Sequence, residues 1–201
     1  MLTLDEVVAA GGYSVIYADP PWLYAAGLPH RGKMPYDCMT PAELTALPVA
    51  RLAARDAVLF LWSTWPKLKE AISLGESWGF SYKTLGFVWI KRTTKSGALV
   101  WGLGNWARAN TEPCLLLVRG RPCRVNKATH QIVEVELTLD TVRGPHSRKP
   151  PEVRAQIERL LGDVPRCELF ARERAPGWDA WGDEVPGGSD FDLSTAADGG
   201  A

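Results

Sequence analysis

The stretch Tyr13-Ser-Val-Ile-Tyr-Ala-Asp-Pro-Pro-Trp22 decides the fold class of this chain. Its first six residues are mostly aromatic or β-branched, which is typical of a buried strand. Pro20 and Pro21 lack the backbone N–H that a strand interior requires, so the strand must stop before them. Asp19 is therefore predicted to lie at the carboxyl end of a buried strand, where open α/β sheets bind their ligands.

Working outward from this stretch, strands and helices alternate along the chain. Apolar runs predict further strands over 57–62, 82–91, 113–118 and 166–171, and an exposed or edge strand over 133–139. Helices are predicted from Pro41, with Thr40 as N-cap, to about Leu47, then over 66–78 and 152–161. This alternation predicts an α/β fold with a mostly parallel sheet covered on both faces. Asp19, Ser63 and Arg172 each fall at a strand end and are expected to converge.

Length and charge indicate how the chain is organised. With 201 residues, it suits a single domain, which we expect over 1–186. Residues 187–201 are rich in Gly, Ala and Asp, and we expect a disordered acidic tail there. Net charge is zero, but five acidic residues lie between Asp183 and the end, and 83–154 holds thirteen basic against five acidic residues. A basic middle with interleaved aromatic residues suits a phosphate backbone, although a solvated charged face gives the same pattern.

Several classes of function lack support in the sequence. The four cysteines are scattered and there are three histidines, so no metal site is predicted. Cys114, in an apolar run, is expected to be a small buried hydrophobe. There is no G-x-G-x-x-G loop and no phosphate-binding G-x-x-x-x-G-K-[ST] motif, which argues against nicotinamide and nucleotide-hydrolysing chemistry. The amino-terminal residues do not resemble a signal peptide, and no apolar run reaches membrane-spanning length, so we expect a cytoplasmic protein without a membrane partner.

The tetrapeptide Asp19-Pro20-Pro21-Trp22 suits the binding of an aromatic amine. Such an amine is a poor nucleophile because its lone pair is delocalised into the ring, and acceptors for its N–H groups restore lone-pair density. Asp19 offers a carboxylate, and the two prolines present carbonyl acceptors without competing backbone donors. Trp22 offers a flat face on which a base stacks, worth about 1–3 kcal/mol. The alternative is an ordinary strand-ending turn with a buried Trp.

The order of motifs resembles the MT-A70-like N(6)-adenine methyltransferases, the family related to the catalytic subunit of the mRNA adenosine methyltransferase. The resemblance covers about Tyr13 to Val185, and Asp19–Trp22 is similar to the family's catalytic motif. The other similar elements follow in order: Pro35–Met39, Phe60–Trp62, Gly104–Trp106 with Glu112, His146–Pro150, Glu168–Arg172 and Gly177–Glu184. Two residues depart from the pattern: Ala171 stands where the family usually has Gly, and Asp183 where it commonly has Asn. We expect these departures to retune cofactor affinity without abolishing binding.

The resemblance implies a single Rossmann-like, S-adenosylmethionine-dependent methyltransferase domain. Its motif order is circularly permuted, since the catalytic motif precedes the cofactor-binding strand. It assigns catalysis to Asp19, Pro20, Pro21 and Trp22. Substrate binding is assigned to Tyr36, Trp106, Glu112 and Glu168. Cofactor binding is assigned to Asp19, Lys149, Arg172, Arg174, Asp183 and Glu184.

Several of these residues have ordinary structural alternatives. Trp106 is equally suited to a core, and Glu112 and Glu168 to pairing with basic side chains. Lys149 and the Arg172–Arg174 run could be solvated charges, whereas Tyr36 lies in a polar loop without core spacing.

The expected function is transfer of a methyl group from S-adenosylmethionine to the N6 amine of adenine in nucleic acid, with DNA favoured over RNA. The alternative is a catalytically silent, nucleic-acid-binding subunit of a methyltransferase complex. We also expect a homodimer, because so small a domain would use a second copy to build its nucleic-acid groove.

Overall fold

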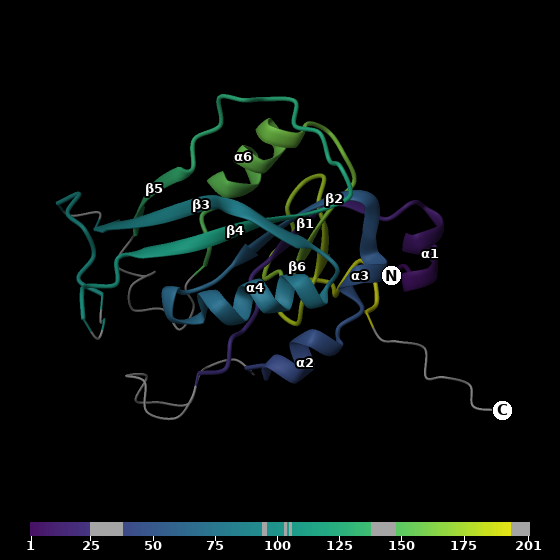
Figure 1. Ribbon diagram of the computed structural model, residues 1–201, viewed down its shortest axis with the longest axis horizontal. Coiled ribbons are helices and arrows are strands. Elements are labelled where there is room, and N and C mark those ends of the chain that lie inside the picture. Colours follow the sequence, from purple (N-terminus) through teal and green to yellow (C-terminus); the bar gives the residue numbers. More distant parts are fainter. Residues whose placement is uncertain (25–37, 94–95, 103, 105, 138–147, 194–201) are drawn as a thin grey trace.

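A seven-stranded sheet forms the centre of the molecule (Figure 1). The computed structural model describes residues 1–24, 38–93, 96–102, 104, 106–137 and 148–193. The strands lie in the order β5-β3-β4-β2-β1-β6-β7. Their bounds are β1 Tyr13–Ala18, β2 Ala53–Trp62, β3 Ser81–Thr93, β4 Thr111–Arg119, β5 Ile132–Leu137, β6 Arg166–Leu169 and β7 Asp179–Trp181.

Strand direction confirms the predicted, mostly parallel sheet. β1 pairs in parallel with β2 and β6, and the pairs β3–β5 and β6–β7 are parallel too. β4 is antiparallel to both of its neighbours, β2 and β3, and so runs against all the other strands of the sheet. Since β1 lies between β2 and β6 and is parallel to both, the carboxyl ends of these three strands meet at one edge of the sheet. The catalytic motif follows β1 and the predicted cofactor-binding segment follows β6, as the permuted motif order requires.

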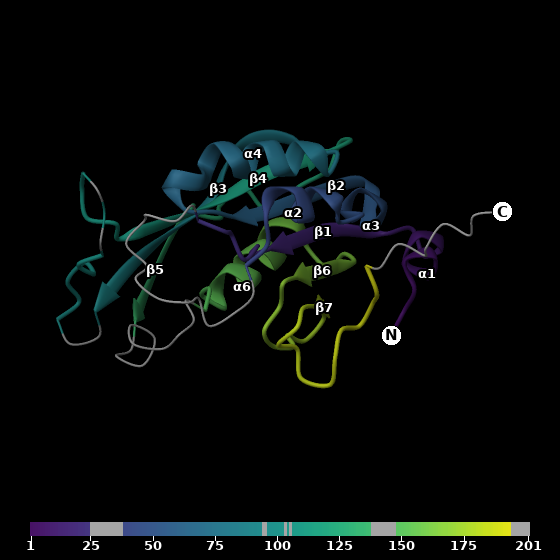
Figure 2. The same cartoon turned by 90° about the horizontal axis from the view of Figure 1, so that it is seen from below.

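Helices cover both faces of the sheet, as Figure 2 shows for α2, α3 and α4 on one side and α6 on the other. The helices are α1 Leu4–Ala9, α2 Pro41–Ala46, α3 Val49–Leu52, the 3₁₀ turn η1 Trp65–Lys67, α4 Leu68–Ser77 and α6 Glu152–Leu161. β1 contributes to two apolar cores, because alternate side chains of a strand point to opposite faces. Ile16 and Ala18 pack in the core under α2 and α4, whereas Val15 and Tyr17 pack in the core under α6.

Local sequence signals account for most of these elements. Thr40 and Glu43 form the capping box that opens α2, and Pro41 occupies the first helical turn. The helix predicted over 66–78 is present as η1 followed by α4, and Gly79, with a φ of 84°, ends it. Cys114 is fully buried, as expected for a small hydrophobe. Among the described residues, no helix is long and apolar enough to cross a membrane.

The prediction that 187–201 is a disordered tail is wrong for residues 187–193. Phe191 is fully buried and Leu193 is 3% exposed, both within the core under α2 and α4. Asp190 accepts a hydrogen bond from the backbone N–H of Ala180 and pairs with Arg174. Two apolar side chains in a segment otherwise made of Gly, Ser and Asp were too weak a pattern to indicate burial. The rest of the predicted tail, 194–201, lies outside the described residues.

The sequence also did not predict three short elements. α1 and α3 pack against each other beside the amino-terminal end of β1. β7, only three residues long, extends the sheet beyond β6. α3 and β7 carry too few residues to show a hydrophobic period. α1 has a local signal that was overlooked, because Thr3 and Glu6 form the same kind of capping box as opens α2.

Candidate active site

Asp19 is the first residue after β1 and lies where three strand ends meet. Its backbone N–H donates to the carbonyl of Leu169, the last residue of β6, at 3.4 Å. On the other side, Ala18 pairs with Leu61, two residues before Ser63. Asp19 is thus flanked by the ends of both neighbouring strands, and the predicted convergence with the segments of Ser63 and Arg172 is confirmed.

A chain of four alternating charges begins at Asp19. Nζ of Lys149 donates to Oδ2 of Asp19 at 2.8 Å and lies 3.4 Å from Oε2 of Glu112. The other oxygen of Glu112 pairs with Lys91, at the end of β3. The four side chains are between 14% and 22% exposed, so water screens their interactions only in part. We call Asp19, Lys149, Glu112 and Lys91 the charge chain.

The four charges of the charge chain stabilise one another. Burial opposes the charge of Lys149, but Asp19 and Glu112 outweigh this effect and raise the pKa of its ammonium above the ordinary value. Burial likewise acts to raise the pKa of Glu112, yet Lys149 and Lys91 together lower it below the ordinary value. Lys149 also lies over the indole of Trp62, 5.5 Å from the ring centroid. Lys149 and Glu112 are therefore both charged at neutral pH.

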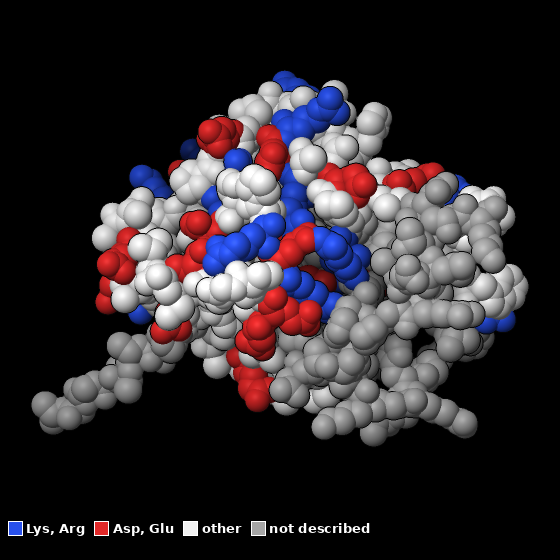
Figure 3. All heavy atoms as spheres, turned by 180° about the vertical axis from the view of Figure 1, so that it is seen from behind, with Lys and Arg blue, Asp and Glu red and all other residues white. Residues whose placement is uncertain are grey.

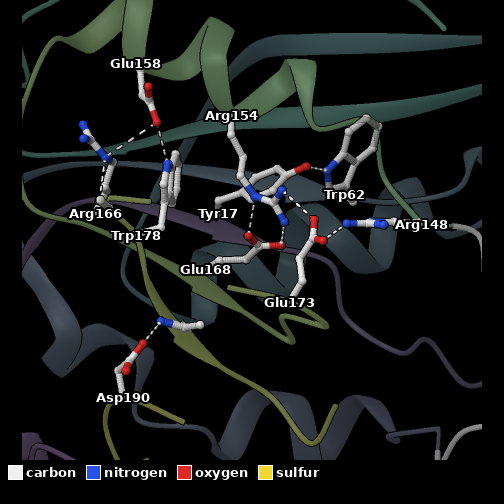
Figure 4. Close-up of polar contacts among 12 residues, drawn as sticks. Tyr17, Trp62, Arg148, Arg154, Glu158, Arg166, Glu168, Glu173, Trp178 and Asp190 are labelled. Carbon is white, nitrogen blue, oxygen red and sulfur yellow. Dashed lines mark hydrogen bonds and ion pairs between the residues drawn. The ribbon is translucent and has the colours of Figure 1, made fainter. Parts of the chain in front are cut away.

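A second ionic cluster lies beside Asp19 on the α6 side, and Figure 4 shows Arg154 reaching from α6 toward two carboxylates. Arg154 binds Glu168 through two nitrogens, at 2.6 and 3.0 Å, and Glu173 at 3.1 Å. Arg148 also pairs with Glu173. Burial raises the pKa of Glu168 above its ordinary value, although Arg154 opposes that shift. Glu168 therefore pairs with a basic side chain, which was the alternative to its predicted role in substrate binding.

Asp19 and Lys149 of the charge chain line one pocket together with the second ionic cluster. Its walls are Asp19, Arg148, Lys149, Arg154, Glu168, Phe170, Arg172 and Glu173. On the face seen in Figure 3, basic and acidic side chains lie next to one another across the middle of the molecule. A pocket with both signs of charge suits a ligand that itself carries both signs.

The backbone after β6 is strained where it borders this pocket. Phe170 has a φ of 61°, a left-handed conformation that is uncommon for a bulky residue. Its ring packs edge-on against Trp181, with centroids 5.4 Å apart. Gly182 follows, and a Cβ there would lie 2.2 Å from the carbonyl oxygen of Ala171. Only glycine permits this close approach of the 181–184 segment to the end of β6.

Trp22 is buried, contrary to its predicted role as an open stacking face. The side chain is 7% exposed and packs in the core under α2 and α4. Its Nε1 donates to the carbonyl of Trp62 at 3.2 Å, which fixes the ring. In this arrangement Trp22 supports the turn, as the structural alternative described.

The prolines leave acceptor capacity next to Asp19. The carbonyl of Pro20 accepts from the N–H of Trp22 at 2.9 Å, and that of Pro21 accepts from the N–H of Met39 at 2.9 Å. A carbonyl oxygen has two lone pairs, so these bonds leave room for a further donor.

Some of the remaining predicted site residues lie near the pocket, and others do not. Arg172 and Glu184 face each other at 3.9 Å, and Asp183 beside them is exposed. Arg174 instead contacts the 186–190 segment through all three guanidinium nitrogens. That arrangement is structural and does not support cofactor binding by Arg174. Trp106 is fully exposed on the β3–β4 hairpin and belongs neither to a core nor to the pocket. Tyr36 lies outside the described residues.

Sequence reasoning missed Lys91 and Arg154. Each is a basic residue in a regular element, where a solvated side chain is the ordinary expectation. The one available signal was that Lys91 follows the buried end of a strand. No group of three or more His, Cys, Asp or Glu in the described part of the chain is placed to hold a metal ion.

Comparison of the sequence with known proteins gives matches to one family. The MT-A70 family pattern matches residues 13–184. The chain is 36% identical to "Type II methyltransferase M.MunI" of Mycoplasma sp, over 91% of this chain and 83% of that protein. It is 30% identical to "N(6)-adenosine-methyltransferase MT-A70-like" of Arabidopsis thaliana, over 88% of this chain and 24% of that protein. It is also 28% identical to "N(6)-adenosine-methyltransferase catalytic subunit METTL3" of Homo sapiens, over 90% of this chain and 30% of that protein. The chain thus spans most of the first relative and about a quarter to a third of the other two.

Proposed function

Because this chain belongs to the MT-A70 family and is a methyltransferase, we propose that it transfers a methyl group from S-adenosylmethionine to the N6 amine of adenine in nucleic acid. The observation that carries the proposal is the position of Asp19 at the end of β1, paired with Lys149 and bordered by the Pro20 carbonyl. Two relatives whose names specify N(6)-adenosine support adenine as the acceptor.

The residues around Asp19 suit the acceptor amine. A carboxylate offers two oxygens, and Oδ2 is the one that accepts a hydrogen bond from Lys149. An N–H bond donated to Asp19 and a second one donated to the Pro20 carbonyl would restore lone-pair density on the amine. Both acceptors are fixed, by Lys149 and by the proline ring, so little ordering is needed when the amine binds. After transfer, the amine has one proton to lose, and Asp19 is the carboxylate placed to accept it.

The pocket residues fit S-adenosylmethionine, which when bound would supply an electrophilic methyl group, its methyl–sulfur bond breaking to leave S-adenosylhomocysteine. The sulfonium and ammonium of S-adenosylmethionine are cations, and its carboxylate is an anion, so it needs partners of both signs. Asp19, Glu168 and Glu173 are acidic, and Lys149, Arg148 and Arg172 are basic, all around one pocket. Asp183 and Glu184 follow Gly182, which holds their segment against Ala171, and their carboxylates suit ribose hydroxyls. We assign cofactor binding to Asp19, Lys149, Arg172, Asp183 and Glu184.

We further propose that DNA is favoured over RNA. The relative that matches over most of both chains, M.MunI, is not among those named for adenosine, the ribonucleoside. Nucleic acid as the partner also agrees with the basic bias of 83–154. In a duplex, the target base has to leave the stack, at a cost of a few kcal/mol.

The proposal is tested by mass spectrometry of nucleosides from DNA and from RNA incubated with the protein and S-adenosylmethionine. We expect N6-methylated deoxyadenosine to exceed N6-methylated adenosine. Methylation of another base, or of no nucleoside, would contradict the proposal. A silent subunit would bind nucleic acid but not S-adenosylmethionine, so calorimetric titration with the cofactor separates that alternative.

A further inference from the structure

Lys91 is separated from Lys149 by a single side chain, that of Glu112. It pairs with Glu112, and Glu112 in turn contacts Lys149 at 3.4 Å. Its ammonium also lies over the indole of Trp89, 4.6 Å from the centroid. The Lys91 side chain is only 17% exposed and is held at the β3–β4 pairing, where Trp89 is opposite Glu112. Its position is thus fixed by two contacts that lead into the active site.

Lys149 has two carboxylate partners, Asp19 and Glu112. How strongly its ammonium pairs with each of them determines how well Asp19 can accept a hydrogen bond or a proton from the amine. If Glu112 were neutral, the Lys149 ammonium would be drawn to Asp19 alone. A carboxylate engaged in that way is a weaker acceptor for an amine and a weaker base. A charged Glu112 also attracts the Lys149 ammonium, which weakens the pairing between Lys149 and Asp19 and leaves Asp19 a stronger acceptor.

We propose that Lys91 is a positioning residue that fixes the Glu112 carboxylate against Lys149, so that Lys149 is shared between Glu112 and Asp19. This inference rests on the proposed function, because it assigns Asp19 to the acceptor amine. It adds to that function a residue on β3 that touches neither substrate nor cofactor and acts through two intervening side chains.

The charged and titratable groups around Glu112 make the proposal specific. They are Lys91 on β3, Lys149 before α6, Asp19 through Lys149, and the Tyr24 hydroxyl, whose pKa is raised mainly by burial and also by Glu112. Without Lys91, Lys149 would be the one cation of the charge chain left for the two carboxylates Asp19 and Glu112, in a site that is mostly buried. Burial would then raise the pKa of Glu112, and Glu112 would become neutral as the pH falls.

The test compares Lys91→Met with wild type and with Lys91→Arg, measuring kcat and KM for adenine-containing DNA between pH 6 and pH 9. Glu112 should lose its charge at a higher pH in Lys91→Met than in wild type, so we expect the kcat of Lys91→Met, relative to wild type, to fall progressively from pH 9 to pH 6. KM should change by less than about twofold, since Lys91 does not contact substrate. Lys91→Arg keeps the charge and should restore most of the wild-type pH profile.

Two further measurements separate this role from loss of stability. Glu112→Gln cannot titrate, so the double variant Lys91→Met/Glu112→Gln should lose the added pH dependence. Carbon-13 NMR of labelled Glu carboxyl groups, with the Glu112 resonance identified by its absence in Glu112→Gln, should show a higher Glu112 pKa in Lys91→Met. Arg51→Met, which removes the cation of the exposed pair between Arg51 on α3 and Asp5 on α1, is the matched control and should leave the pH profile unchanged.

The proposal is overturned if Lys91→Met shows the wild-type pH profile, or if its loss is the same at every pH and follows the fall in melting temperature. If wild type methylates no nucleoside, the proposed function fails. The NMR titration then still decides whether Lys91 controls the ionisation of Glu112. If wild type is active but the titration of Glu112 is unchanged in Lys91→Met, only the inference on Lys91 fails.

Discussion

Lys149 and Asp19 are 130 residues apart in the sequence, yet Nζ of Lys149 lies 2.8 Å from Oδ2 of Asp19. Asp19 comes directly after β1, and Lys149 lies just before α6. The contact therefore links two parts of the chain. One is the turn that carries the Asp19 carboxylate, and the other is the segment that leads into α6, which covers one face of the sheet. Because Lys149 also approaches Glu112 at 3.4 Å, this one ammonium connects three separate parts of the chain.

Replacing Asp19 with Ala should abolish methyl transfer while leaving affinity for S-adenosylmethionine within about tenfold. The carboxylate acts mainly on the amine as the new bond forms, so its loss affects the transition state more than the bound cofactor. Calorimetric titration paired with a transfer assay measures both quantities. Asp19→Asn, which keeps the shape and loses the charge, is the matched control and should also be inactive. Substantial turnover in either variant would remove Asp19 from the mechanism.

Glu112 and Glu168 should affect stability with opposite dependence on pH. The pKa of Glu112 is lowered on folding, so its stabilising contribution is present above about pH 4.5 and is lost as the pH falls below that value. The pKa of Glu168 is raised on folding, so stability decreases as the pH rises above about 4.5. Urea unfolding of wild type, Glu112→Gln and Glu168→Gln across pH 3.5–7 measures both contributions. Acidification should shrink the difference between wild type and Glu112→Gln. Acidification should also raise the free energy of unfolding of wild type relative to that of Glu168→Gln. If the two differences in unfolding free energy changed with pH in the same direction, the assignment would be contradicted.

Truncation should distinguish the docked residues of the carboxyl-terminal segment from residues 194–201. Ending the chain after Pro186 removes Phe191 and Leu193, which are 0% and 3% exposed. Loss of each large core side chain typically costs about 2–5 kcal/mol, so we expect a large fall in the free energy of unfolding. Ending the chain after Leu193 should leave stability nearly unchanged. Urea denaturation of both truncations, with Phe191→Ala as the control for the core contact alone, tests this. A stable protein ending at Pro186 would show that the packing of Phe191 contributes little.

The β3–β4 hairpin should contribute to nucleic-acid binding in two separable ways. Arg108 is exposed and lies over the ring of Trp101, 4.3 Å from the centroid, and Trp106 is fully exposed. Arg108→Gln should weaken binding to all sequences and reduce the slope of log affinity against log salt by about 1, because a phosphate contact releases counterions. Trp106→Ala should cost about 1–3 kcal/mol of binding and leave that slope unchanged, because stacking is nearly insensitive to salt.

Fluorescence anisotropy at several salt concentrations measures both effects. Lys83→Gln, an exposed substitution on β3 far from the hairpin tip, shows how much any lost cation reduces the slope. If Trp106→Ala binds as well as wild type, the hairpin does not stack on bases.

The sequence by itself determined the strand of 13–18, the turn at Asp19-Pro20-Pro21 and the order of strands and helices. These features come from local chemistry: prolines end strands, a Thr-Pro-x-Glu pattern opens a helix, and buried strands are continuously apolar. Because the carboxyl ends of adjacent parallel strands meet at one edge, the sequence also predicted that the segments after β1, β2 and β6 converge.

Only the tertiary structure decided which partners these residues have. Trp22 could face solvent or the core, and packing against α2 and α4 buried it. Lys149 could be a solvated cation, and the approach of Asp19 and Glu112 from distant segments fixed it inside the site. Lys91 and Phe191 had no local signal strong enough to show their partners, because pairing and burial depend on side chains that the sequence keeps far apart. The chemistry of each residue is a local property, whereas its electrostatic environment is created only when the sheet brings separate strand ends together.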